Sequence, residues 1–244
     1  MRSVILTGVN GGIGSAIAHY LTNQGYKVIG IDISESSDVV DHYISFDLSL
    51  LSVSEKNIET LKEQVLKLNS DSDIFALVNN AAIQRLGGVE NVSLDDVSSS
   101  LSVNVIAPLM LTKAFISELD KANGSVVNIG SIHNGLTKPG FVCYAMSKAA
   151  LAGMTKSLAV DCGHRIRVNA IQPAAVETDM LVEGFRETPD KLDDLKKYHP
   201  TGNIGSPYEV AKLLHLMISD DLPFLNGSVI DINGGIGSRL HDPI

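Results

Sequence analysis

The sequence of 244 residues predicts an α/β fold, in which a doubly wound parallel sheet of about seven strands carries helices on both faces as a three-layer sandwich. Two observations predict it. Short apolar runs without polar alternation recur along the chain, and such runs are typical of strands buried on both faces. Longer stretches with helical periodicity separate these runs, and repeated strand–helix units build parallel sheets with right-handed crossovers.

The apolar runs and the periodic stretches alternate along the whole chain. Strands are predicted over 3–6, 27–31, 74–78, 125–129, 166–171 and 228–232, and helices over 13–21, 61–68, 104–119 and 145–161. Gly25 is suited to end the first helix, because glycine tolerates the left-handed conformation that commonly follows a helix.

No linker and no internal repeat interrupts this alternation, so residues 1–244 are predicted to form a single domain. The segment 179–206 differs from the rest because it is rich in charge and is punctuated by proline and glycine. We expect a surface helix with flexible edges there. Long segments of this kind often close over a substrate as a lid, although an ordinary solvated excursion is the alternative.

Composition narrows the classes of partner. The formal net charge is −9 and the pI about 5.2, and an acidic surface repels phosphate, so nucleic acid and anionic membranes are not expected partners. Cys143 and Cys162 form no metal-binding spacing with histidine, so no catalytic metal is expected, and their small number is typical of a reduced cytoplasmic protein. No apolar stretch approaches the roughly 18 residues of a membrane span.

A glycine-rich loop follows the first predicted strand and opens the first helix. Its glycines, Gly8, Gly11, Gly12 and Gly14, permit a tight turn and the close approach of a phosphate to the backbone. The free N–H groups of the helix N-terminus then favour the negative charge. This context predicts a Rossmann-like dinucleotide site. The glycines fit both G-x-x-x-G-x-G and G-x-x-G-x-x-G, so the loop alone does not choose between subfamilies.

The second predicted strand ends at Asp32, eighteen residues after Gly14. A carboxylate at this place accepts the ribose hydroxyls of the adenosine half of NAD and repels a 2′-phosphate. Residues 33–37 contain no lysine or arginine that would hold such a phosphate, and Asn10 is uncharged. We therefore predict NAD(H) rather than NADP(H) as the cofactor.

Three residues near the fifth predicted strand form a catalytic pattern. Ser131 follows that strand, and Tyr144 and Lys148 lie four residues apart, on one face of a helix. A neighbouring ammonium stabilises a phenolate, so we expect Lys148 to lower the pKa of Tyr144 towards the working pH. Tyr144 would then exchange a proton with an alcohol or a carbonyl, while Ser131 holds the substrate oxygen near the nicotinamide.

With these motifs, the chain resembles the classical short-chain dehydrogenases/reductases from end to end. The resemblance is carried by Thr7-Gly8 with Gly12-Ile13-Gly14, Asn79-Asn80-Ala81-Ala82, Asn104, Ser131, Tyr144, Lys148, Pro173-Ala174-Ala175-Val176-Glu177-Thr178, and Asn226-Gly227 with Asn233-Gly234-Gly235. Ala82 and Ala174 stand where the family has glycine. Alanine is tolerated at these two positions if φ stays negative.

The resemblance implies roles for individual residues. Asn104 joins Ser131, Tyr144 and Lys148 in catalysis by holding a water, and Lys148 also binds the nicotinamide ribose. The cofactor-binding residues that it implies, together with those predicted above, are Gly8, Asn10, Gly11, Gly12, Ile13, Gly14, Asp32, Ile33, Asp47, Leu48, Asn80, Ala81, Ala82, Tyr144, Lys148, Pro173, Ala175, Val176 and Thr178. The resemblance also implies a homo-oligomer, either a tetramer or a dimer.

The substrate is expected to be a small alcohol or ketone. Its predicted contacts are Ser131, His133, Phe141 and Met180. A local cation, Lys138 or Arg186, would suit an anionic substrate despite the acidic net charge.

The sequence therefore predicts an NAD(H)-dependent oxidoreductase that transfers a hydride between nicotinamide and an alcohol or ketone carbon, with Tyr144 as general acid/base. Three alternatives stay open. One is an NADPH-linked carbonyl or ketoacyl reductase, which Asp32 opposes. Another is a relative of the nucleotide-sugar epimerases or dehydratases, which the short chain opposes. The third is a non-catalytic module that senses NAD(H), which the intact set of catalytic residues opposes.

Overall fold

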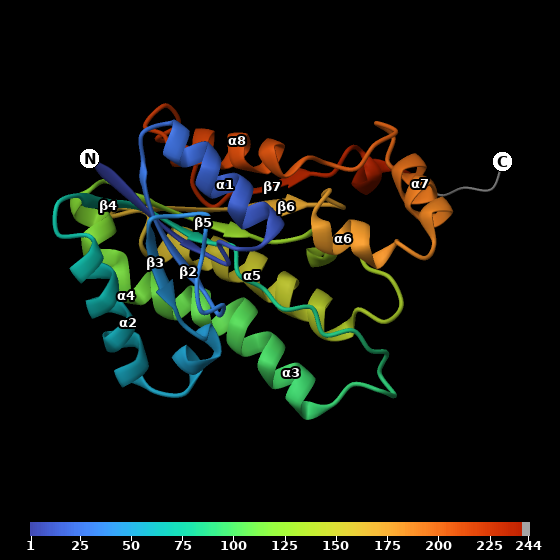
Figure 1. The fold of residues 1–244 in the computed structure, drawn as a ribbon, viewed down its shortest axis with the longest axis horizontal. Helices are drawn as coiled ribbons and strands as arrows, with labels where there is room; N and C mark the ends of the chain where they lie inside the picture. The colour runs from blue at the N-terminus through green and yellow to red at the C-terminus, as the bar shows by residue number, and fades with distance from the viewer. Residues whose placement is uncertain (241–244) are drawn as a thin grey trace.

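The computed structural model describes residues 1–240, with the side chain of Met180 outside the described part. Within it, a seven-stranded parallel sheet has the strand order β3-β2-β1-β4-β5-β6-β7 (Figure 1). The strands are β1 Arg2–Thr7, β2 Lys27–Asp32, β3 His42–Ser45, β4 Asp73–Asn79, β5 Ser125–Ile129, β6 Arg167–Pro173 and β7 Val229–Ile232. The order reverses between β1 and β4, which places a crevice at the carboxyl ends of these strands. The predicted Rossmann-like fold is confirmed.

Helices cover both faces of this sheet. The α-helices are α1 Gly12–Asn23, α2 Glu55–Leu68, α3 Leu94–Leu101, α4 Ala107–Lys121, α5 Val142–Asp161, α6 Asp179–Gly184, α7 Pro189–Tyr198 and α8 Pro207–Ile218. Shorter turns are η1 Leu48–Ser52, η2 Ser102–Ile106, η3 Ile132–Asn134 and η4 Ile236–Ser238. Helices α1 and α8 pack together on one face, while α2, α4 and α5 cover the other (Figure 1).

Two apolar clusters lie on the two faces of the sheet. Successive residues of a strand point to opposite faces, so Ile5 packs with Phe115 of α4, and its neighbour Leu6 packs with Ile17 of α1 and Leu214 of α8. All five side chains are fully buried. This burial on both faces explains why the strand sequences lack polar alternation.

The helical run Leu94–Lys121 contains α3, the π-helical turn η2 and α4. It reaches a mean hydropathy of 1.4 over 18 residues, so by length and composition it qualifies as a membrane span, which the sequence analysis did not expect. Its apolar side chains Leu111, Phe115 and Leu119 are instead buried in the cluster against the sheet. Core helices of soluble proteins share this composition.

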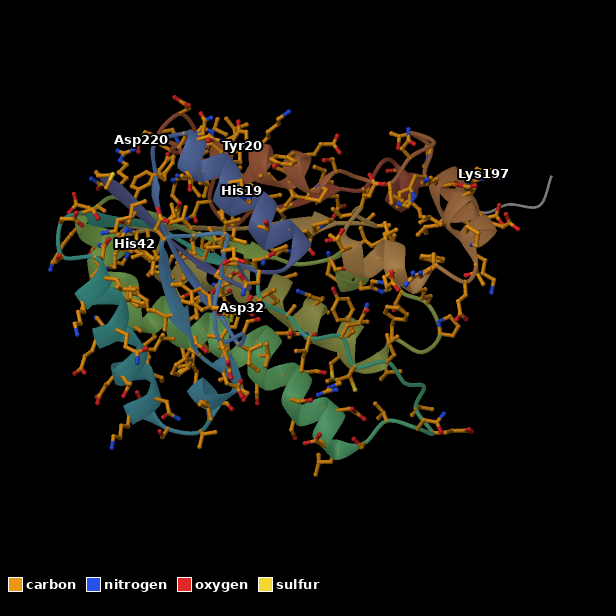
Figure 2. All side chains as sticks on the ribbon, in the orientation of Figure 1. His19, Tyr20, Asp32, His42, Lys197 and Asp220 are labelled. Carbon is orange, nitrogen blue, oxygen red and sulfur yellow. The ribbon has the colours of Figure 1, made fainter. Side chains whose placement is uncertain are left out.

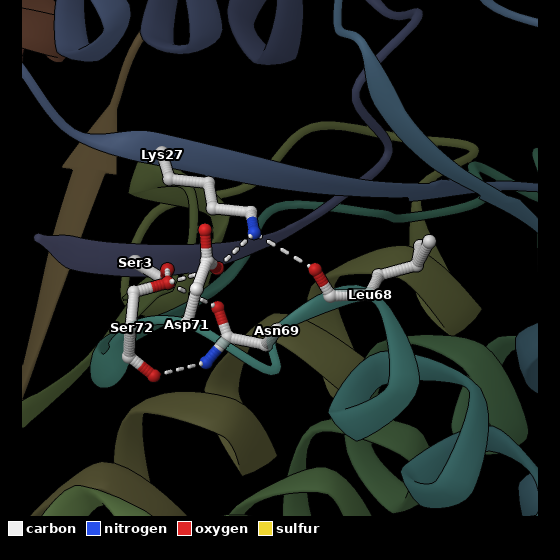
Figure 3. Close-up of polar contacts among 6 residues, drawn as sticks. All are labelled: Ser3, Lys27, Leu68, Asn69, Asp71 and Ser72. Carbon is white, nitrogen blue, oxygen red and sulfur yellow. Dashed lines mark hydrogen bonds and ion pairs between the residues drawn. The ribbon is translucent and has the colours of Figure 1, made fainter.

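A polar cluster lies at the amino-terminal ends of β1 and β2 (Figure 3). The ammonium group of Lys27, whose side chain is only 6% exposed, donates to the carbonyl of Leu68 at 2.8 Å and to Asp71 at 2.7 Å. The Ser3 and Ser72 hydroxyls share a hydrogen bond of 2.7 Å. These bonds connect the C-terminal end of α2 to the beginnings of β1 and β2, at the strand ends that lie away from the crevice.

Two elements differ from the sequence prediction. Strand β3 was not among the predicted apolar runs, because it is a short edge strand and its first two residues, His42 and Tyr43, are only half-buried. The segment 179–206 forms two helices, α6 and α7, rather than one. Its C-terminal end is tied down by hydrogen bonds of Gly205 N–H to the carbonyl of Ala175 at 2.9 Å and of Thr201 N–H to the carbonyl of Gly234 at 3.2 Å.

Candidate active site

The glycine loop lies at the carboxyl end of β1, and the structure selects one of the two glycine patterns. Gly8 has φ of +67°, which glycine adopts without strain. A Cβ at Gly14 would overlap the Gly8 carbonyl oxygen, and one at Gly12 would lie 2.7 Å from Cγ2 of Thr178. A Cβ at Gly11 would find ordinary contacts, the nearest at 3.5 Å. Packing around the loop therefore favours G-x-x-x-G-x-G, because the Thr178 side chain restricts Gly12 while Gly11 has room for a Cβ.

A hydrogen-bonded brace holds this loop to the end of β4. The buried Thr7 hydroxyl accepts from the backbone N–H groups of Asn80 and Ala81, both at 3.0 Å. The Asn80 side-chain amide donates to the carbonyl oxygens of Thr7 and Gly8, also at 3.0 Å. Asn80, predicted to bind the cofactor, thus shapes the loop from behind.

Asp32 stands at the end of β2, beside the glycine loop (Figure 2). Its carboxylate accepts from the backbone N–H of Asn10 at 3.1 Å and of Ser34 at 3.3 Å. These bonds fix the carboxylate at the rim of the crevice, where the ribose hydroxyls of a dinucleotide are predicted. Ile33, the next residue, is 71% exposed.

The pair predicted near adenine, Asp47 and Leu48, begins the turn η1. Asp47 caps this turn by accepting from the backbone N–H of Ser49 at 2.9 Å, and the Leu48 side chain is buried in the core. Both residues follow β3, the outermost strand on this side of the sheet.

Lys148 and Tyr144 share one face of α5, as their spacing predicts. The Lys148 ammonium is buried and donates to the carbonyl of Ile129, at the end of β5, over 2.9 Å. It lies 5.6 Å from the centroid of the Tyr144 ring. Burial lowers the pKa of Lys148 to about 8.

In this structure the net shift of the Tyr144 pKa is upward, opposite to the predicted direction. Burial raises the pKa of Tyr144 above its ordinary value, and a hydrogen bond with the Ser131 side chain opposes this rise only in part. The reason is that burial penalises the phenolate more than the neighbouring groups stabilise it. The neutral tyrosine is therefore the resting form, which suits proton donation.

Ser131 caps the turn η3, and Gly130 separates it from the end of β5. Its hydroxyl accepts from the backbone N–H of His133 at 3.3 Å, and its own backbone N–H donates to the side-chain oxygen of Gln172 on β6. The structure thus brings Ser131, Tyr144 and Lys148 together at one strand end. Gln172 was missed from the sequence, where the one signal was its place immediately before Pro173.

Asn104 lies in the π-helical turn η2 and is buried. Its side-chain oxygen accepts from the backbone N–H of Ile83, and its amide donates to the Ile83 carbonyl and to the Ser147 hydroxyl, each at 2.9 Å. Ser147 also donates to the Tyr144 carbonyl at 2.8 Å. Asn104 therefore connects the loop after β4 to the helix that carries the tyrosine, and its predicted role in holding a water stays a prediction.

Two of the predicted substrate contacts, His133 and Phe141, form an aromatic group with Tyr144. The His133 ring stacks on Phe141 at 4.6 Å and meets the Tyr144 ring edge-on at 5.6 Å. The Lys138 ammonium lies 4.6 Å from the Phe141 centroid. Burial and this cation lower the pKa of His133.

The other proposed contacts lie on α6 and its end. Met180 belongs to α6, but its side chain lies outside the described residues. Arg186, the second candidate cation for an anionic substrate, pairs with Glu183 at 2.9 Å.

The segment after β6 closes the site from the other side. Val176 forms an isolated β-bridge with Gly205, and Thr178 caps α6 by accepting from Leu181 N–H at 3.3 Å while its methyl group faces Gly12.

Within residues 1–240 the only non-glycine residue with positive φ is Asn123. Ala82 and Ala174 thus keep the negative φ that alanine tolerates. The tight glycine turn and the N-terminus of α1 that follows it suit the binding of a nucleotide pyrophosphate.

The fold and this site define a class of protein, an oxidoreductase that uses a nicotinamide cofactor. The family model described as Enoyl-(Acyl carrier protein) reductase matches residues 8–237. The 3-oxoacyl-[acyl-carrier-protein] reductase FabG of Haemophilus influenzae is 32% identical over 241 residues, covering 96% of this chain and 98% of the relative. The chain belongs to the short-chain dehydrogenase/reductase family.

Solved structures of two similar proteins carry different nicotinamide cofactors. A 4-hydroxyisoleucine dehydrogenase complexed with NADH has a TM-score of 0.87 and 28% identity, covering 98% of this chain and 100% of the other. A gluconate 5-dehydrogenase candidate of Beutenbergia cavernae, with NADP at low occupancy, has a TM-score of 0.86 and 26% identity, covering 98% and 97%.

Proposed function

We propose that the protein is an NAD(H)-dependent dehydrogenase/reductase that acts on a small secondary alcohol or its ketone, with Tyr144 as the general acid/base. The observation that carries the proposal is the convergence of Ser131, Tyr144 and Lys148 at the end of β5, in the same parallel sheet whose strand β1 leads into the glycine loop. NAD, when bound, would accept or supply the hydride.

In the direction of reduction, the neutral Tyr144 hydroxyl donates its proton to the developing alkoxide of the substrate. Ser131, whose side chain lies near enough to Tyr144 to influence its pKa, would hold the same oxygen and fix the distance over which the proton moves. The buried Lys148 ammonium stabilises the tyrosinate that remains, and its hydrogen bond to the Ile129 carbonyl keeps it from turning away. In the direction of oxidation, the same tyrosinate takes the proton from the alcohol.

The preference for NAD(H) is supported by Asp32. Its carboxylate is fixed by Asn10 and Ser34 at the place where a 2′-phosphate would approach, and like charges repel there. Titration of the protein with NADH and with NADPH tests this, and tighter binding of NADPH would refute it. Asp32→Ala should bring the two dissociation constants closer together.

A screen of alcohols with NAD and of ketones with NADH, followed by nicotinamide absorbance, tests the reaction. Tyr144→Phe should abolish turnover and keep NADH binding, because the substitution removes only the hydroxyl. Tyr208→Phe, at a half-exposed tyrosine on α8, is the matched control and should leave turnover unchanged. A Tyr144→Phe variant with unchanged turnover would refute the role of the tyrosine.

The similarity to FabG favours one second candidate, an NADPH-linked ketoacyl reductase. That function predicts reduction of 3-oxoacyl thioesters with NADPH in preference to NADH. The same two titrations and a thioester substrate separate the candidates. The predicted homo-oligomer, a tetramer or a dimer, is tested by analytical ultracentrifugation.

A further inference from the structure

We propose that Gln172, on β6, is a positioning residue that holds Ser131 in its reactive orientation. The inference rests on the proposed function, because it assigns a purpose to the orientation of the serine beside Tyr144. The Gln172 side-chain oxygen accepts from the backbone N–H of Ser131, so Gln172 would act through the backbone of the serine and not on the substrate itself.

The contact extends the ladder between β5 and β6 beyond its last backbone bond. Gly130 N–H donates to the Ile171 carbonyl at 2.8 Å, and the next N–H, that of Ser131, donates to the side-chain oxygen of Gln172. The Gln172 side chain is fully buried. It therefore holds Ser131 in an extended conformation, with φ of −167°, at the point where the chain turns into η3.

Gly130 leaves the space that this side chain fills. A Cβ at Gly130 would overlap the Gln172 side-chain oxygen and would lie 2.6 Å from its Cδ. Gly130 is not among the glycines with positive φ, so its missing side chain is explained by this packing and not by backbone conformation. The glycine and the glutamine thus form one arrangement around the Ser131 N–H.

The arrangement is not explained by stability alone. The Gln172 amide nitrogen is buried without a hydrogen-bond partner among the described residues, and a buried unpaired donor destabilises the fold. Gln172→Met would remove this donor but leave the Ser131 N–H without its acceptor. Because one unpaired group replaces another, we expect the thermal unfolding midpoint to change little, while the serine loses its anchor.

The first test is kinetic. Gln172→Met should lower kcat by about 10- to 100-fold, the effect of a small misplacement of a catalytic group, with an unchanged Kd for NADH. The matched control is Asn169→Leu on the same strand, where a fully buried amide accepts from Ser228 N–H at 3.0 Å and donates to the Leu225 carbonyl at 2.8 Å, away from the serine. It should reduce stability without reducing kcat.

A double-mutant cycle separates positioning from a general structural role. In a Ser131→Ala background, Gln172→Met should produce no further loss of kcat, because the hydroxyl that it positions is already absent. An equal loss in both backgrounds would overturn the proposal. So would a loss of NADH binding that parallels the loss of kcat.

The second test does not depend on turnover. Amide hydrogen exchange should show a protected Ser131 N–H in the wild type and faster exchange in Gln172→Met, and unchanged exchange would overturn the proposal. Should the wild type turn over no alcohol or ketone, the proposed function fails, while this measurement still decides the contact. If Gln172→Met does not fold, Gln172→Asn, which withdraws the acceptor by one methylene, gives the same comparison.

Discussion

The Thr7 hydroxyl supports the glycine loop, and the loss in the free energy of unfolding on its removal can be worked out from its hydrogen bonds. Thr7→Val keeps the shape of the side chain but leaves the N–H groups of Asn80 and Ala81 without their acceptor. An unsatisfied buried donor costs about 1–3 kcal/mol. Since Asn80 and Ala81 are only half-buried, we take the lower part of that range for each and expect a loss of about 2–4 kcal/mol in the free energy of unfolding.

Urea denaturation measures this loss, and Thr7→Ser is its control, because serine keeps the hydroxyl and loses one methyl group. We expect Thr7→Ser to lose about 1 kcal/mol. Thr7→Val should also weaken NADH binding, measured by fluorescence titration, because Asn80 braces the carbonyl of Gly8. If Thr7→Val is as stable as Thr7→Ser, the hydroxyl does not support the loop.

Three further predictions concern the loop and the titrating pair. Gly14→Ala should unfold at a lower urea concentration than Gly11→Ala, because only the former places a methyl group on the Gly8 carbonyl; equal midpoints would contradict the glycine pattern. Lys148→Met should lose turnover yet gain about 2 kcal/mol of stability at pH 7, since it removes a buried charge. The pKa of Lys148 falls from 10.5 to about 8 on folding, so between these pH values the unfolded chain binds more protons than the folded chain and wild-type stability rises with pH. The stability gained by Lys148→Met should therefore be smaller in urea titrations at pH 9.5 than at pH 7. A gain that is the same at both pH values would argue against a buried Lys148 charge. Because burial raises the pKa of Tyr144 above its ordinary value of 10.0, alcohol oxidation should accelerate and ketone reduction should slow only as pH rises beyond 10, which pH–rate profiles in both directions will show.

The parts of the fold that depend on local pattern could be predicted from the sequence. Strands β1, β4 and β5 are buried and rich in apolar residues without regular polar alternation, because both faces of the sheet are covered, and that burial leaves a clear signal. Strand β3 has one edge free and half-buried polar residues, so its four residues carry no such signal.

The candidate site divides in the same way. The spacing of Tyr144 and Lys148 predicts their shared helix face, but the direction of the tyrosine pKa depends on burial, which spacing does not report. The support of Ser131 by Gln172 and of Asn80 by Thr7 joins residues 41 and 73 positions apart. Such contacts follow from the register of neighbouring strands, and no local motif encodes them.

Because the Lys148 ammonium is anchored to the end of β5, the residues for proton transfer and the residues for substrate choice are held by different parts of this chain. Proton transfer depends on the strand end at Ile129, whereas His133 and Met180, two of the residues expected to contact the substrate, lie on η3 and α6, outside the sheet. Changes in those outer segments leave the strand register untouched. The substrate specificity of such a protein can therefore change while the residues for proton transfer stay in place. Exchange of these outer segments is a route to altered substrate specificity by engineering.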